Sequence, residues 1–424
     1  MMDTQRLVAL AVFAFSSMLL WEAWQKHNAP KIVDAPASTV PASSASRGVV
    51  PAPTGPGASP TTAAVPSASA PAKALGEPVM VKTDLFDVEL NTLGGDIRRV
   101  TMKKVHSALD RTQPLTLMEP DPEHYYVAQS GLLGEGLPTH KNAYEASQRA
   151  YALADGKDSV EVSFKARDAT GADVTKRYTF HRGSYVIDIG YDITNRSDQP
   201  IAPLAYFQFL RDANPPSEQA AQTSKFAGVT TFTGPAVYTD EGKFHKVDFS
   251  DIAKGKQSHA KVAKDGWIGI IQHYFVSAWL PKAGVEREYF TSKVGDNLYT
   301  AGIKTPVGTI APGATATVSV PVYIGPQETE ILEGVAPGLK LAVDYGWLYV
   351  LAAPLFYVLN WIHGVVGNWG WSIILLTIVI KLIFYPLNAK AGRSMAQMKV
   401  LGPKMEKLKQ LYGDDRQKLN QAMM

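Results

Sequence analysis

An almost unbroken apolar run, "GNWGWSIILLTIVIKLIFYPL", extends from Gly367 to Leu387. About 20 apolar residues in a helix cross the hydrocarbon of a bilayer, so the run predicts a transmembrane helix. One charged residue, Lys381, lies inside it. A charge within hydrocarbon costs about 3 kcal/mol on insertion scales, which makes an intramembrane lysine a candidate functional residue.

Composition excludes several classes of function. The chain has 424 residues, enough for two or three domains, and a formal net charge of +3, too close to neutral for a nucleic-acid binder. It has no cysteine, which excludes disulfides and thiolate metal sites. None of the nine histidines forms an i, i+4 pair, and no phosphate-binding GxxxxGK motif occurs. We therefore expect no cofactor, no metal and no nucleic-acid partner.

A shorter apolar run lies near the N-terminus, from Leu7 to Trp21. Its length fits either a cleaved signal peptide or a membrane anchor. A signal peptide would be followed by small residues, whereas Glu22 and Trp24 follow here, and tryptophan favours the membrane interface. We therefore predict a retained anchor and then a disordered linker, because residues 25–78 are rich in Pro, Ala, Ser and Thr.

Residues 79–331 carry the alternating pattern of β-strands. In "SVEVSFKAR", Val160, Val162 and Phe164 share one face, with polar residues between them. The segments "SYVIDIGYDITN" and "ATATVSVPVYIG" repeat this alternation, and Gly, Asn and Asp separate such segments. Strict period two predicts half-buried strands, so we expect one large antiparallel β-sandwich.

After the sandwich the chain is apolar from Trp347 to Tyr385, long enough for two membrane spans. Pro354 interrupts the first half, whose polar and small residues fall on one side of a helix, which predicts a helix lying in the membrane interface. The tail from Asn388 to Met424 holds eight Lys or Arg and three acids, a balance of 8 − 3 = +5. The positive-inside rule places this tail in the cytoplasm, which a single crossing after Trp369 satisfies.

On a helix, Thr377, Lys381 and Tyr385 share one face. Two interpretations of the lysine remain open at this point. Its long stem could carry the ammonium group to the cytoplasmic headgroups. Alternatively, the shared face could line a polar, positively charged cavity that opens to the cytoplasm. Such a cavity needs more walls than one helix provides.

The basic tail is amphipathic, with Met395, Met398 and Met405 in an apolar helical stripe and lysines outside it. Gly413 then breaks the helix and permits a hairpin turn. Such a stripe fits a coiled coil. It also fits a soft, Met-rich surface that contacts varied hydrophobic clients.

The C-terminal residues resemble one family. The stretch "DYGWLYVLAAPLFYVLNWIHGVVGNWGWSIILLTIVIKLIFYPL", followed by "SMAQMKVLGPKMEKLKQLYGDDRQKLNQAMM", is similar to the YidC/Oxa family of membrane protein insertases, in its Gram-negative form. The specific match covers residues 344–424, and the anchor, tether and β-sandwich before it also fit. The family core has five spans and this sequence carries only the first, so we expect a fragment or a truncated gene product, or else that the rest of the core lies elsewhere.

The resemblance assigns roles to particular residues. It implies that Lys381 takes the place of the family's single basic groove residue and that Thr377 lies on the path of a client's transmembrane segment. Gly370 and Tyr385 become candidates for the groove or for helix packing. The resemblance also implies a mutarotase-like sandwich fold and a client-contact stripe in the cytoplasmic tail, formed by Met395, Met398 and Met405.

The expected organisation follows the chain in six parts. These are an N-terminal transmembrane anchor (1–24), a disordered linker (25–78), a periplasmic β-sandwich (79–331), a linker with an interfacial amphipathic helix (332–368), a second transmembrane helix (369–387) and an incomplete cytoplasmic helical hairpin (388–424).

The function that the resemblance implies is insertion and folding of inner-membrane proteins through a cationic groove, alone or with the Sec translocon. The chain is then not an enzyme but a multi-pass inner-membrane protein with a large periplasmic domain. The implied partners are nascent inner-membrane proteins, the Sec translocon with its accessory subunits, membrane lipid and the ribosome. Two alternatives are a periplasmic adaptor and an anchored sugar-binding or mutarotase-type domain. The second lacks an assignable acid–base spacing among its candidates, Asp188, His181, His245 and His273.

Overall fold

The computed structural model of this protein describes residues 65, 76–107, 110–166, 171–215, 232–343 and 349–412, with backbone alone for 349–351, 400–401 and 404–412. The expected N-terminal anchor, nearly all of the expected linker and the expected hairpin turn lie outside these residues.

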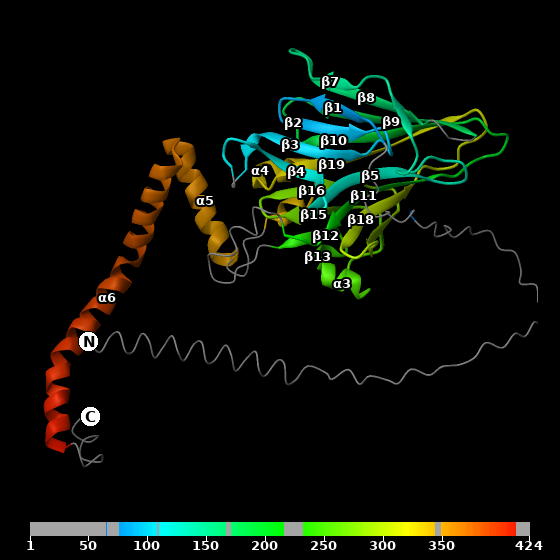
Figure 1. The fold of residues 1–424 in the computed structure, drawn as a ribbon. Helices are drawn as coiled ribbons and strands as arrows, with labels where there is room; N and C mark the ends of the chain where they lie inside the picture. Colours follow the sequence, from blue (N-terminus) through cyan, green and yellow to red (C-terminus); the bar gives the residue numbers. More distant parts are fainter. Residues whose placement is uncertain are drawn as a thin grey trace, which may run out of the picture. The chain divides into compact units, whose positions relative to one another are not determined.

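The described strands form two β-sheets (Figure 1). In pairing order, the ten-stranded sheet contains β14 (Val262–Ala263), β17 (Arg287–Lys293), β18 (Leu298–Pro306), β11 (Leu204–Asp212), β5 (Tyr125–Leu133), β4 (Pro114–Pro120), β3 (Ile97–His106), β2 (Phe86–Asn91), β1 (Pro78–Lys82) and β7 (Ala150–Ala152). The nine-stranded sheet contains β13 (Lys243–Lys246), β12 (Thr233–Thr239), β15 (Trp267–Gln272), β16 (Phe275–Trp279), β19 (Thr315–Pro326), β10 (Val186–Asn195), β9 (Ala172–His181), β8 (Ser159–Ala166) and β6 (Tyr144–Ala146).

The pairing of these strands is antiparallel with one exception. Strand β7 pairs with β1 in parallel, with Val81 opposite Tyr151. Parallel neighbours need a long crossover connection, and here several strands of both sheets separate β1 from β7 in the chain. The predicted β-sandwich is confirmed. The prediction that all its strands pair in antiparallel fashion is wrong at this edge.

The core lies between the two sheets, where the alternating apolar residues meet. Val162 and Phe164 of β8 are buried, and Ser163 between them and Glu161 and Lys165 on either side are more exposed. One continuous core cluster joins Val88 of β2 with Val322 of β19, so inward side chains of the ten-stranded sheet pack on those of the nine-stranded sheet. Burial of each such side chain stabilises the fold by about 1.5–3 kcal/mol.

Short helices accompany the sandwich: α3 (Phe249–Ala253), α4 (Thr329–Val335) and the 3-10 helix η1 (Leu339–Ala342). Leu332 and Leu339 are fully buried in a second core cluster with Trp267. Gly338 precedes η1 with φ +71°, and a Cβ there would lie 2.5 Å from the Tyr238 ring, so only glycine fits. The chain after β19 is therefore packed on the sandwich as far as the end of η1.

Two longer helices follow, α5 (Tyr349–Val366) and α6 (Trp369–Tyr412). The helix expected around Pro354 is present, and α5 continues through the proline. Its place in the membrane interface stays a prediction. Proline at that position removes one backbone donor, toward the carbonyl four residues earlier, and the rest of the helix stays hydrogen-bonded. Likewise, α6 continues through Pro386 and Pro403, across the boundary expected at Leu387. Where its membrane part ends remains a prediction.

Candidate functional site

A tight corner joins α5 to α6. Gly367 has φ +68°, the left-handed conformation that ends many helices, and its N–H donates to the His363 carbonyl at 2.7 Å. Asn368 then caps α6, since its side-chain oxygen accepts a hydrogen bond from the Trp371 N–H at 3.2 Å. Its carbonyl accepts the Ser372 hydroxyl at 2.8 Å. These bonds fix how the chain leaves α5 and enters α6.

The first half of α6 exposes its apolar side chains. The segment Trp369–Lys399 is the only part of the described chain that is long and apolar enough to cross a membrane. Of its most apolar stretch of 18 residues, 6% is buried. A core helix of a soluble protein would be mostly buried, so this surface needs lipid or further helices around it. The large exposed apolar residues are Trp369, Trp371, Ile373, Ile374, Leu375, Ile378, Val379, Leu382, Ile383, Phe384, Tyr385 and Leu387.

Lys381 and its helical neighbours Thr377 and Tyr385 are all exposed on α6. The Thr377 hydroxyl donates to the Ile373 carbonyl at 2.8 Å, which satisfies its proton and leaves its oxygen as an acceptor. Lys381 lies 381 − 369 = 12 residues into α6, or about 18 Å along the axis, in the later half of a span of roughly 30 Å.

The side of α6 that carries Lys381 is not the side covered at the corner. Helix α5 contacts α6. Ser372 in the first turn is fully buried and Leu376 is half-buried. At 100° per residue these two positions lie roughly opposite Lys381. The face of Thr377 and Lys381 is therefore open for a client or for further helices.

Gly370, Met395 and Met398 occupy exposed positions as well. Gly370 lies in the first turn of α6, where an added Cβ would lie 3.2 Å from the Asn368 side-chain oxygen, so its place is beside the cap. Met395 and Met398 are 61% and 51% exposed further along α6. Met405 lies in the part of α6 described by backbone alone. The roles of all these residues remain predictions.

The sandwich brings together two residues of the sugar-enzyme alternative. His181 Nε2 lies 2.8 Å from Asp188 Oδ2 across β9 and β10, and both side chains are about 40% exposed. His245 lies on β13 and His273 in the turn between β15 and β16. Sequence spacing did not show the His181–Asp188 contact, because strand register decides it.

Sequence reasoning also missed a buried polar cluster in the sandwich around Lys176. In "ADVTKRYTFH" the lysine stands at an inward position between Val174 and Tyr178. The sequence did contain a signal for this cluster. A lysine at a position where the alternating pattern expects a buried apolar residue indicates a buried charge that needs a partner.

Comparison with known proteins gives the family. The family described as YidC periplasmic domain matches residues 78–358, and the 60Kd inner membrane protein family matches residues 361–424. The membrane protein insertase YidC of Aromatoleum aromaticum is 49% identical over 424 residues, all of this chain and 76% of that protein. The insertase YidC of Nitrosospira multiformis is 45% identical over 437 residues, again all of this chain and 76% of that protein.

A solved structure of a galactose mutarotase related enzyme from Lactobacillus acidophilus is a more distant match. It covers 58% of this chain and 97% of its own, with a TM-score of 0.36 and 11% identity. A similarity of that size supports no inference about activity. The sequence relatives, in contrast, cover this chain from end to end. The chain belongs to the YidC family of membrane protein insertases.

Proposed function

We propose that this protein inserts membrane proteins by means of a cationic, partly polar surface on α6 within the membrane, centred on Lys381. The observation that supports the proposal is the combination of a membrane-length helix with exposed apolar side chains and one lysine on the face away from the buried Ser372. Thr377 adds a hydroxyl oxygen one turn earlier on that face. Further helices supply the remaining walls of the groove.

The mechanism is physical and needs no bond-making step. A client's N-terminal tail with acidic or polar groups enters the groove from the cytoplasm, which shortens the hydrocarbon path that the tail has to cross. At about 4 Å and an effective dielectric constant of about 20, an acid–lysine contact is worth roughly 4 kcal/mol, enough to capture a tail that can still leave. The client's apolar helix then enters lipid, which contributes about 0.8 kcal/mol per CH₂ group.

The proposal includes a topology. Residues 1–24 anchor the chain, the sandwich lies in the periplasm, α5 lies in the interface, and α6 crosses to a cytoplasmic tail with an excess of positive charge. Exposed Met395 and Met398 then contact hydrophobic clients on the cytoplasmic side. Nascent inner-membrane proteins, the Sec translocon with its accessory subunits, the ribosome and lipid are the partners of this arrangement.

Substitution of Lys381 tests the groove. A groove charge has to be cationic, so Lys381→Arg retains insertion of a client with an acidic tail, while Lys381→Gln, Lys381→Ala and Lys381→Glu lose it. A lysine that only reaches the headgroups tolerates Gln. Each variant is expressed in the intact protein at one fixed level, and insertion is measured by protease protection of the client. Full insertion by Lys381→Ala would refute the groove.

The cysteine-free sequence allows a clean test of topology. Single variants Lys165→Cys, on strand β8, and Lys399→Cys, on α6, are treated in intact spheroplasts with a membrane-impermeant maleimide. The proposal predicts labelling of Lys165→Cys alone, and labelling of both after the membrane is opened. Labelling of Lys399→Cys in sealed spheroplasts would contradict a single crossing by α6.

A further inference from the structure

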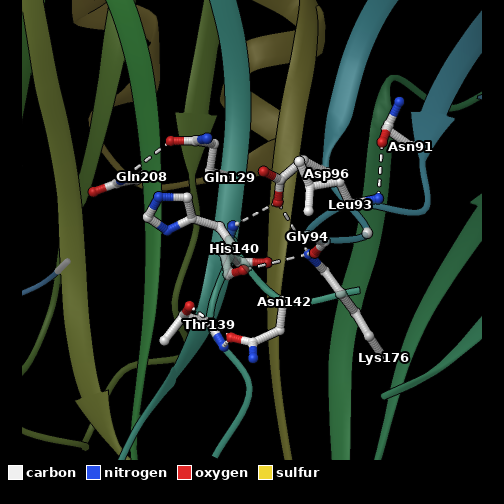
Figure 2. A network of polar contacts seen from close by, with 12 residues as sticks. Asn91, Leu93, Gly94, Asp96, Gln129, Thr139, His140, Asn142, Lys176 and Gln208 are labelled. Atoms are coloured by element: carbon white, nitrogen blue, oxygen red, sulfur yellow. Dashed lines mark hydrogen bonds and ion pairs between the residues drawn. The ribbon is translucent and has the colours of Figure 1, made fainter. Parts of the chain in front are cut away.

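A fully buried lysine links the two sheets of the sandwich (Figure 2). Lys176 extends from β9 of the nine-stranded sheet, and its Nζ donates to the Gly94 carbonyl at 2.9 Å. The same Nζ lies 3.5 Å from Asp96 Oδ1 and 3.5 Å from the Ser130 carbonyl. Gly94 and Asp96 belong to the turn between β2 and β3, and Ser130 to β5, all in the ten-stranded sheet.

Two tyrosines of the nine-stranded sheet strengthen this link. The Tyr178 hydroxyl donates to the Gly95 carbonyl, and the Tyr191 hydroxyl shares a hydrogen bond of 2.8 Å with Ser130 Oγ. The Lys176 ammonium lies 5.5 Å and 5.6 Å from the two ring centroids, within range of cation–π attraction. Polar side chains of one sheet thus meet polar groups of the other inside an apolar core.

Other titratable groups face this cluster from the surrounding elements. Arg98 acts on Asp96 from β3, and His140 lies beside the cluster in the connection between β5 and β6, where the exposed Lys141 acts on His140. Burial lowers the pKa of His140 to about 4, and the nearby cations add to the shift, so His140 is neutral above that pH. Its Nδ1 lies 2.6 Å from the Tyr206 hydroxyl. Burial raises the pKa of all the tyrosines around the cluster, which stay neutral: Tyr144, Tyr178, Tyr191 and Tyr206.

Only Asp96 and Lys176 therefore titrate near neutral pH in this cluster. Burial raises the pKa of Asp96 to about 6, against the opposing attraction of Lys176 and Arg98. Burial lowers the pKa of Lys176 to about 8, against the attraction of Asp96. Both groups are charged between these two values.

The effect on stability follows from linkage. The folded chain binds the Asp96 proton more tightly than the unfolded chain, so the stabilisation from that proton is lost as pH rises through about 6. The folded chain holds the Lys176 proton less tightly than the unfolded chain does, so the neutral form of Lys176 favours folding at high pH. This contribution to stability is lost as pH falls through about 8 and Lys176 becomes charged. The pair contributes least to stability between the two values.

We propose that the Asp96–Lys176 pair selects one packing of the two sheets, and that it does so at the expense of stability, most of all near neutral pH. Removal of two charges from water often outweighs their attraction, whereas loss of one partner leaves the other charge buried and is strongly destabilising. Because only one packing brings Lys176 to the turn at Gly94 and Asp96, other packings separate the two charges and leave the buried Lys176 without its carboxylate partner.

The test compares three variants of the full chain in detergent by the melting temperature of the sandwich between pH 5 and pH 9. At pH 7, Asp96→Asn and Lys176→Met each lose on the order of 10 °C. The double variant Asp96→Asn with Lys176→Met melts within about 3 °C of the parent, or above it. If a single variant fails to fold, the double variant and the parent still decide the question.

The pH profiles separate this account from a purely steric one. The loss in Lys176→Met shrinks toward pH 5, because the unpaired Asp96 takes up a proton. The loss in Asp96→Asn shrinks toward pH 9, because the unpaired Lys176 releases one. Parallel profiles for the two variants, or a double variant as unstable as the worse single one, would overturn the proposal.

An adjacent surface pair gives a matched control. Arg177 follows Lys176 on β9, and its Nε lies 2.9 Å from Asp192 Oδ2, with both side chains more than 30% exposed. Exposed pairs contribute about 0–1 kcal/mol. Arg177→Met with Asp192→Asn therefore shifts the melting temperature by less than about 3 °C at every pH. An equally large and pH-dependent shift in this control would also overturn the proposal.

Discussion

Lys176 and Lys381 both lie among apolar side chains, but their surroundings differ in kind. Lys176 has no exposed surface, and its ammonium group contacts a carbonyl and a carboxylate of its own chain. Lys381 is exposed on a helix whose apolar side chains are exposed as well. The sandwich provides the partners of its own buried charge, whereas α6 depends on lipid, further helices or a client.

The sandwich therefore buries its apolar and charged side chains within itself, whereas α6 exposes them to whatever surrounds the helix. Changes in the sandwich core should appear as losses of folding stability. Changes on α6 should leave the sandwich folded and appear as losses of membrane crossing or insertion. Pairs of matched substitutions, one in the sandwich or on α6 and one control, can therefore test whether the two regions differ in this way.

The largest expected effect is in the sandwich core. Trp279 is fully buried, with ring centroids 5.3 Å from Phe207 and 5.1 Å from Phe209. Trp279→Ala should lower the free energy of unfolding by about 3–5 kcal/mol. Trp371→Ala, at a position 62% exposed on α6, should change it by less than about 0.5 kcal/mol. Denaturant unfolding followed by far-UV circular dichroism measures both, and equal losses would contradict the comparison.

A smaller effect is expected from a charge on the side of α6 that points away from Lys381. Val379 lies near the middle of the predicted span, roughly opposite Lys381 on the helix, and is 40% exposed. Val379→Asp should disfavour crossing by about 3 kcal/mol, or about 100-fold in the equilibrium. In a Lys399→Cys background, periplasmic labelling of the tail should therefore appear. Val379→Ile is the matched control, and no labelling of the Asp variant would show that this side does not face lipid.

The smallest effect is expected at the corner between α5 and α6. Asn368→Ala removes the cap and should cost about 1 kcal/mol at the start of α6. Amide exchange at Trp371 should then speed up by about fivefold, as measured by hydrogen–deuterium exchange. Asn388→Ala, in the interior of α6, lacks a capping role and serves as the control. Equal exchange in the two variants would exclude Asn368 as the cap.

Much of this architecture could be predicted from local patterns. Alternation placed Val162 and Phe164 inward, and the structure buries both. The apolar run that begins at Trp369 predicted a membrane-length helix, and α6 has that length and exposure. Both predictions rest on the pattern of apolar residues within one segment. That pattern directly reflects which side chains are buried in a sheet or face a bilayer.

What sequence could not predict depends on pairing between distant segments. The His181–Asp188 contact requires the register of β9 against β10, and the Lys176–Asp96 contact requires one packing of two sheets. The parallel pairing of β1 with β7 joins segments far apart in the chain. The boundary expected at Leu387 lies inside α6, because Pro386 removes one hydrogen bond and the helix continues past it.

A double-mutant cycle between Lys381 and the acids of one client's tail tests directly whether the lysine attracts those acids. Insertion is measured for the parent and for Lys381→Gln, each with the acidic client and with the same client after its acids are changed to amides. Neutralising the acids should reduce insertion by the parent by about tenfold and insertion by Lys381→Gln by less than about twofold, a coupling of more than about 1 kcal/mol. If the two changes instead reduce insertion independently, so that their effects simply multiply, Lys381 does not act on the client's acids and the groove account is wrong.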